Sequence, residues 1–149
     1  VQESLRSPVR GVKISSDKEK AAIFNRNQIC VVYLTRESKL LYGQESFVLN
    51  YPGWEILDVF WHSDSYHLVL VTRKHIVVTE ANIKSSPVIL VNLNKDTPIV
   101  FYEEDKDSLY FSDSQLGGDS LSYENIYKLE LNSRQSIFNN LIKPNQNEK

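Results

Sequence analysis

Short apolar runs alternate with polar turns along most of the chain. The runs are rich in β-branched and aromatic residues, and spacing typical of an amphipathic helix is nearly absent. Such runs predict β-strands rather than helices. We expect strands at residues 12–15, 21–25, 29–34, 46–50, 56–61, 68–72, 75–79, 88–93, 99–102, 108–112, 125–131 and 135–138. The polar stretch 35–44 is expected to hold a short helix or an extra turn.

The predicted strands form a unit that occurs three times. Each copy carries two landmarks, an aspartate in the first turn and an isoleucine in the third strand: Asp17, Asp64 and Asp105, then Ile29, Ile76 and Ile126. The aspartates are 47 and 41 residues apart, and the isoleucines are 47 and 50 apart. Repeats of about 40–50 residues with several short strands are typical of propeller blades.

The repeat therefore predicts an all-β, β-propeller-like fold with three four-stranded antiparallel blades. The blades cover residues 9–50, 54–93 and 97–138 of one domain, 1–142, and a disordered tail follows at 143–149. Closed propellers have at least about four blades, so the predicted ring is incomplete. We expect further blades or self-association to cover the end blades. A small, unrelated β-sandwich is the alternative.

Composition narrows the functional classes. The formal net charge of the 149 residues is -2, which gives no electrostatic basis for nucleic-acid binding. No apolar run approaches the roughly 20 residues of a spanning helix, so we expect no membrane contact by this segment. The single cysteine, Cys30, lies in an apolar run and is expected to be a small buried residue.

Catalytic and metal-binding motifs are absent from the sequence. It contains no G-x-S-x-G, H-E-x-x-H or C-x-x-C pattern, so we predict no enzyme activity, no catalytic residue and no cofactor. His62, Asp64 and His67 fall near one turn and could hold a metal. We favour a solvated turn in which Asp64 accepts backbone N–H groups, and predict no metal site. Gly117 and Gly118 precede no helix that could bind phosphate, which indicates a flexible loop.

A candidate binding surface follows from the meander. Connections in a meander alternate between two faces, so the aspartate turns share one face, while the links between blades lie on the other. A long loop is predicted at 113–124 on this second face, and loops on a rigid scaffold often carry binding sites. We predict that a protein or glycan partner binds there, at Tyr51, Trp54, Lys95, Asp96, Leu116, Gly117, Gly118 and Asp119. In the alternative interpretation, Trp54 packs between blades and the loop is a neutral insertion.

The third copy resembles the propeller repeat of the TolB-type periplasmic proteins. The matching stretches are 102–105, 109–113 and 125–129, together with 61–64 in the second copy. The family's Pro before the aspartate and Gly after it are missing here. The chain is also similar to propellers that follow PEGA domains in bacterial surface proteins. These resemblances imply a non-catalytic interaction or scaffold module of a larger, extracytoplasmic or membrane-anchored protein. The alternative is the gating propeller of a prolyl-oligopeptidase-like serine peptidase.

Overall fold

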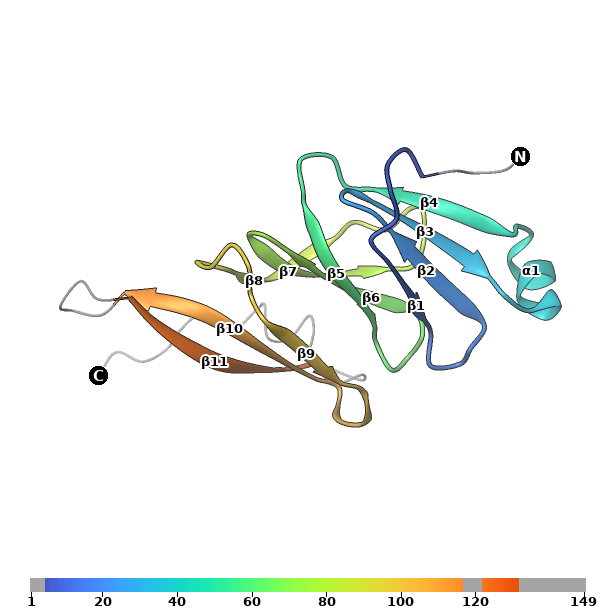
Figure 1. Cartoon of the computed structure of the whole chain (residues 1–149). Helices are drawn as coiled ribbons and strands as arrows, with labels where there is room; N and C mark the ends of the chain where they lie inside the picture. Colours follow the sequence, from blue (N-terminus) through green and yellow to red (C-terminus); the bar gives the residue numbers. More distant parts are fainter. Residues whose placement is uncertain (1–4, 117–121, 132–149) are drawn as a thin grey trace.

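Three antiparallel sheets follow one another along the chain in the computed structural model, which describes residues 5–116 and 122–131 (Figure 1). In every sheet each strand pairs with the next one in sequence. The strands are β1 (Gly11–Ile14), β2 (Lys20–Phe24), β3 (Gln28–Tyr33), β4 (Ser46–Asn50), β5 (Ile56–Trp61), β6 (His67–Thr72), β7 (His75–Glu80), β8 (Val88–Asn92), β9 (Val100–Glu103), β10 (Ser108–Leu116) and β11 (Ser122–Glu130). The predicted all-β, blade-like fold is confirmed. The strand predicted at 135–138 and the tail predicted at 143–149 lie outside the described residues.

One short helix, α1 (Arg36–Tyr42), connects β3 to β4, where the sequence indicates a helix or turn. The Thr35 hydroxyl accepts a hydrogen bond from the Ser38 N–H group and caps the first turn. Gly43 ends the helix in the left-handed conformation, with φ of 64°. Within residues 5–116 and 122–131, no helix combines the length and the apolar content needed to cross a bilayer.

The first hairpin has the same register in all three sheets. In each copy, the residue three positions before the landmark aspartate pairs with a residue seven positions further along the chain. The pairs are Ile14 with Ala21, Trp61 with Leu68, and Tyr102 with Leu109. These positions are therefore structurally equivalent, as the repeat predicts. The turns that follow them lie along the lower edge of the view in Figure 1.

The aspartate turn itself is present in only two of the three copies. Asp17 accepts a backbone hydrogen bond from Glu19, and Asp64 accepts two from the backbone that follows it. In the third copy, Asp105 lies exposed in the short helix η1 (Glu104–Lys106). Asp107 takes the inward position instead, two residues later in a connection of the same length, because the helical turn η1 occupies the start of that connection. Asp105 thus lies in the connection between the first and second strands, as predicted, but it does not cap that connection as Asp17 and Asp64 cap theirs.

Two hydrophobic cores hold the sheets together, one on each face of the second sheet. Val59, Trp61 and Leu70 belong to the first core, between the first and second sheets, whereas Val69 and Ile76 belong to the second core, against the third sheet. Alternating residues of one strand therefore enter different cores. This explains why residues 68–71 of β6 are all fully buried.

The two end sheets each leave one apolar face uncovered within the described residues. Val12 and Ile14 of β1 are 55% and 61% exposed, and Phe101 and Ile126 of the third sheet are 62% and 80% exposed. The corresponding faces of the second sheet are buried. The described chain is thus an open arc of blades, in agreement with the predicted incomplete ring.

The predicted long loop at 113–124 is mostly a hairpin, so this prediction is wrong. β10 and β11 pair continuously from Ser108 opposite Glu130 to Leu116 opposite Ser122. Only residues 117–121 remain between the strands, and they lie outside the described residues. The sequence did not indicate these strand ends because both faces of the hairpin are polar there, with Ser114 and Glu124 on one side and Gln115 and Asn125 on the other.

Candidate functional site

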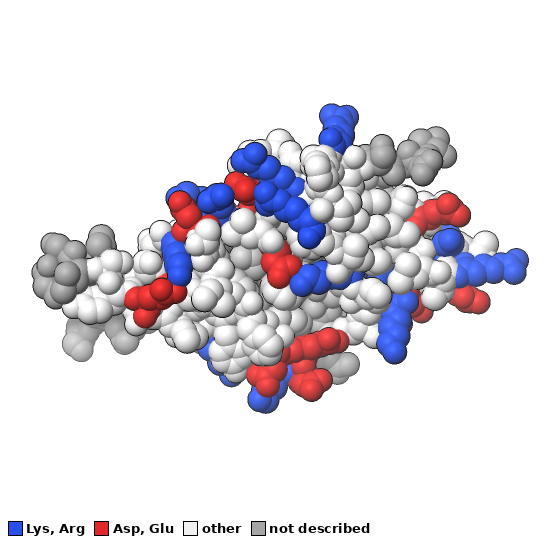
Figure 2. Space-filling view, in the orientation of Figure 1, with Lys and Arg blue, Asp and Glu red and all other residues white. Residues whose placement is uncertain are grey.

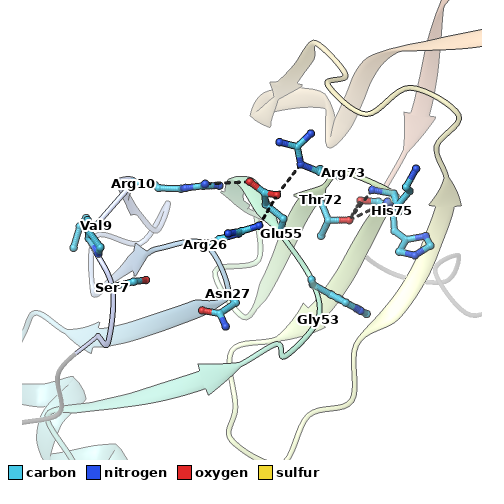
Figure 3. Close-up of a pocket in the computed structure, with 13 residues that line it drawn as sticks. Ser7, Val9, Arg10, Arg26, Asn27, Gly53, Glu55, Thr72, Arg73 and His75 are labelled. Carbon is cyan, nitrogen blue, oxygen red and sulfur yellow. Dashed lines mark hydrogen bonds and ion pairs between the residues drawn. The ribbon is translucent and has the colours of Figure 1, made fainter.

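A basic cleft opens between the first two sheets, on the face opposite the aspartate turns. Its volume is about 830 Å³. Its walls come from the segment before β1, the β2–β3 turn, the link from β4 to β5 and the β6–β7 turn (Figure 3). The lining residues are Ser7, Pro8, Val9, Arg10, Arg26, Asn27, Gly53, Trp54, Glu55, Thr72, Arg73, Lys74 and His75.

Two equivalent turns each present one arginine to this cleft. The Asn25 side-chain oxygen accepts hydrogen bonds from two backbone N–H groups of the β2–β3 turn, at 2.8 and 3.0 Å. The Thr72 hydroxyl does the same in the β6–β7 turn, at 2.9 and 3.3 Å. Asn25 directly follows β2 and Thr72 is the last residue of β6, and the next residue, Arg26 or Arg73, starts the turn. These two arginines are 47 residues apart and occupy the same place in the repeat.

Three guanidinium groups surround the carboxylate of Glu55 (Figure 3). Its oxygens lie 2.7 Å from Nε of Arg73, 3.1 Å from Nη2 of Arg10 and 3.3 Å from Nη2 of Arg26. The hydrogen bonds from Arg73 and then from Arg10 lower the pKa of Glu55 to about 2. Glu55 therefore stays ionised at physiological pH and holds the three arginines in the wall of the cleft.

The cleft carries an excess of positive charge, although the whole chain has a net charge of -2. Its lining contains four cationic side chains, Arg10, Arg26, Arg73 and Lys74, but only one carboxylate, Glu55. The side chain of Arg26 is 67% exposed. In the space-filling view, Lys and Arg side chains crowd together over β5 with an acidic side chain among them (Figure 2). Such a concentration of charge attracts anionic ligands.

Trp54 forms an aromatic part of the same cleft. Its ring stacks on Tyr51 with a centroid distance of 5.7 Å and an interplanar angle of 14°, and it lies 6.2 Å from the ring of His75. Trp54 also packs partly buried against the first core. It therefore combines the two roles that the sequence left open, packing between blades and lining a surface.

The other predicted site residues lie in different places. Tyr51 is only 7% exposed, belongs to the first core and does not line the cleft. Asp96 lies beside the cleft through an ion pair with Lys74 at 2.9 Å. Lys95 pairs instead with Glu124 of the β10–β11 hairpin. Leu116 is the last residue of β10. Gly117, Gly118 and Asp119 lie outside the described residues.

The sequence prediction missed Arg10, Arg26, Glu55 and Arg73. The repeat contained a usable signal for Arg26 and Arg73, because the 47-residue spacing places both in equivalent turns on the predicted binding face. Glu55 and Arg10 follow no landmark. Ser7 was missed as well. Its buried hydroxyl oxygen lines the cleft and has no hydrogen-bond partner within the described part of the chain.

On the opposite face, the turn around Asp64 is less solvated than predicted. His62 is 1% exposed, and its Nε2 atom lies 2.8 Å from the carbonyl oxygen of Leu131. Ser63 adds a hydrogen bond from its hydroxyl to Asp107 at 2.7 Å. These contacts join the turn of the second sheet to the third sheet. The turn is thus part of an interface between sheets rather than a free surface loop.

Comparisons with known proteins give a distant structural similarity. No family model and no curated protein matches the chain. The solved structure of Hsv2 from Kluyveromyces lactis is similar over 86% of this chain and 49% of that chain, with 14% identity and a TM-score of 0.41. Hsv2 from Kluyveromyces marxianus is similar over 85% and 47%, with 11% identity and a TM-score of 0.38. This chain thus spans about half the length of those proteins, and we assign no residue role from the similarity.

Proposed function

We propose that this chain is a non-catalytic binding module whose basic cleft holds an acidic segment of a protein partner. The observation that carries the proposal is the convergence of Arg10, Arg26 and Arg73 on one carboxylate, with Trp54 in the same wall. We further propose that the module belongs to a bacterial surface or envelope protein. This second proposal is supported by the sequence resemblance to TolB-type and PEGA-associated propellers.

The contacts of Glu55 indicate which chemistry the cleft accepts. Arg26 and Arg73 each hydrogen-bond to Glu55 through one nitrogen in the described structure, which leaves most of their N–H donors for a ligand. A guanidinium presents a planar fork of donors that matches a carboxylate. An acidic side chain entering the cleft would extend the network that Glu55 begins.

The apolar part of the lining favours a peptide over a simple anion. Pro8, Val9 and Trp54 line the cleft beside the arginines. Tryptophan and arginine are the residue types that most often dominate the energetics of protein interfaces. A segment with neighbouring acidic and apolar side chains would use both parts of the wall.

The hydroxyl and imidazole groups of the cleft support binding rather than catalysis. The Thr72 hydroxyl donates to the carbonyl oxygen of His75 at 3.0 Å. The imidazole Nδ1 of His75 lies 3.1 Å from the Asn92 side chain. Neither contact forms the nucleophile–base pair that covalent catalysis needs.

The proposal can be tested with a fluorescein-labelled peptide that alternates glutamate with phenylalanine. Its affinity for the whole chain would be measured by fluorescence anisotropy at low and high salt. The test variant is Arg26→Ala/Arg73→Ala. Lys106→Ala is the control, because Lys106 is 65% exposed on the aspartate-turn face, much as Arg26 is on the other face.

We expect each lost arginine to weaken binding by about tenfold, as for a charge-assisted hydrogen bond, and we expect added salt to weaken it further. The control should bind within a factor of about two of the unchanged chain, since surface charges contribute little. Equal affinity of the double variant and the control would refute the proposal. Binding of a heparin oligosaccharide or inorganic phosphate in place of the peptide would refute the choice of partner.

A further inference from the structure

Three potential metal ligands converge on the aspartate-turn face, away from the basic cleft. The His–Asp–His cluster consists of His62, Asp64 and His67, and the ligand atoms of its members lie within 4.8 Å of one another. Oδ2 of Asp64 lies 2.7 Å from Nδ1 of His67 and 3.1 Å from Nδ1 of His62. The folded chain thus brings two imidazoles to one carboxylate oxygen.

Hydrogen bonds orient His62 toward this cluster. Nε2 of His62 faces the carbonyl oxygen of Leu131, which only accepts, so this nitrogen carries a proton. Oδ1 of Asp107 lies 3.6 Å from the same nitrogen. The Asp64 N–H group points at Nδ1 of His62 over 3.3 Å, as expected where Nδ1 carries a lone pair. Histidines that bind metals are usually oriented by such a carbonyl or carboxylate at their other nitrogen.

The turn also fixes the carboxylate. Oδ1 of Asp64 accepts hydrogen bonds from the N–H groups of Tyr66 and His67, at 2.8 and 3.0 Å. Ser65, between Asp64 and Tyr66, adopts a left-handed backbone conformation with φ of 58°. Oδ2 is therefore the oxygen that faces the two imidazoles.

The first sheet shows how the same turn is built without imidazoles. The residues equivalent to His62, Asp64 and His67 are 47 positions earlier: Ser15, Asp17 and Lys20. There the buried Lys20 ammonium contacts Oδ2 of Asp17 at 2.9 Å, so the cation is part of the chain. In the second sheet, two imidazoles take the places of the Ser15 hydroxyl and the Lys20 ammonium.

The cluster is accessible from one side. The side chain of His67 is 30% exposed, whereas that of His62 is 1% exposed. His67 also lines two hollows of about 310 and 230 Å³. An ion could enter from this side and keep an open position for water.

We propose that the His–Asp–His cluster is a binding site for a divalent transition metal such as Zn²⁺. The ligands would be Nδ1 of His62, Nδ1 of His67 and Oδ2 of Asp64, a set of two nitrogens and one oxygen that suits Zn²⁺ and its neighbours rather than Mg²⁺ or Ca²⁺. Binding displaces the proton that lies between Nδ1 of His67 and the carboxylate, and this proton moves to Nε2 of His67 or, from an imidazolium, to the solvent. The ion would stabilise the contact of this turn with the third sheet.

The test is titration of the whole chain with ZnCl₂ by calorimetry, in two buffers that differ in ionisation enthalpy. Co²⁺ is a second probe, because its visible absorption reports four-coordinate nitrogen and oxygen ligation. The variants are His67→Ala and His62→Ser/His67→Lys, the second of which copies the arrangement of the first sheet and should keep the fold. His75→Ala is the control, because the chain has only three histidines. Circular dichroism with a chelator present checks that all variants are folded.

We expect one Zn²⁺ per chain with release of no more than one proton, and affinity weaker by on the order of 100-fold in both cluster variants. His75→Ala should bind as the unchanged chain does, and His67→Ala should still bind the acidic peptide. Absence of saturable Zn²⁺ binding, equal affinity in a folded cluster variant, or loss of binding in His75→Ala would each overturn the proposal.

Discussion

Replacing Trp61 by alanine measures how much one inner-strand position contributes to the packing of two blades. Trp61 is 5% exposed in the first core, and its indole N–H donates to the carbonyl oxygen of Lys13 at 2.9 Å. Burial of about 150–250 Å² of tryptophan surface at about 25 cal/mol per Å² gives roughly 4–6 kcal/mol. This is an upper bound because the unfolded chain is already partly collapsed. We expect Trp61→Ala to lower the free energy of unfolding by about 3–5 kcal/mol, the range for large core aromatics.

Ile14 offers a matched control, since it has the same register in the first sheet but is 61% exposed. Ile14→Ala should change the free energy of unfolding by less than about 0.5 kcal/mol. Both values come from urea denaturation followed by far-ultraviolet circular dichroism. Trp61→Phe keeps a ring but removes the N–H donor, and should fall between the two. If Trp61→Ala and Ile14→Ala lower the free energy of unfolding by amounts that agree within about 1 kcal/mol, Trp61 is not buried and Ile14 exposed as described, and the reasoning is refuted.

Three further predictions concern charge, backbone packing and association. The pKa of Glu55 is lowered from 4.5 to about 2, so its ion pairs stabilise the fold above pH 4.5 and lose this effect as the pH falls toward 2. A carboxylate titration by NMR should show a higher pKa of Glu55 in Arg73→Ala, and an unchanged pKa would contradict this. Gly11→Ala places a Cβ 2.7 Å from two buried ring atoms and should cost about 1–3 kcal/mol in denaturant, which wild-type stability would contradict. Because Ile14 and Ile126 are exposed, we expect copies of the chain to associate in sedimentation experiments, and we expect Ile14→Glu/Ile126→Glu to weaken this association. A strictly monomeric chain would contradict the prediction.

The sequence predicted the strands well where one face of the strand is buried and the other is not. β4 and β5 have the predicted bounds, and the equivalence of Ile14, Trp61 and Tyr102 holds in the pairing register. The prediction failed where a strand continues through backbone pairing while its side chains are polar. The outer half of the β10–β11 hairpin is mostly polar, with Leu116 and Tyr123 as isolated exceptions, so no hydrophobic alternation marks it. The third landmark, Asp105, lies in the predicted connection but is exposed, because the helical turn η1 gives the inward position to Asp107.

The candidate site was harder to predict because it depends on contacts between segments far apart in sequence. The meander correctly indicates which connections share a face, and this placed Trp54 on the surface that contains the basic cleft. It does not indicate that Arg10 and Arg73 reach the same carboxylate, since that contact requires the angle between the first two sheets. The aromatic prediction was likewise incomplete, because the turn after β4 directs Tyr51 into the core and Trp54 to its edge.

The three first turns show how a repeated fold can carry different chemistry at one structural position. Each turn carries a partly buried carboxylate, and burial requires a partner for its charge. In the first sheet the partner is Lys20, which always brings its own cation. In the third sheet Asp107 accepts hydrogen bonds from the hydroxyls of Tyr102 and Ser63. Only in the second sheet are the partners imidazoles, and among the described turns only that one offers nitrogen ligands to a metal ion while the backbone stays the same.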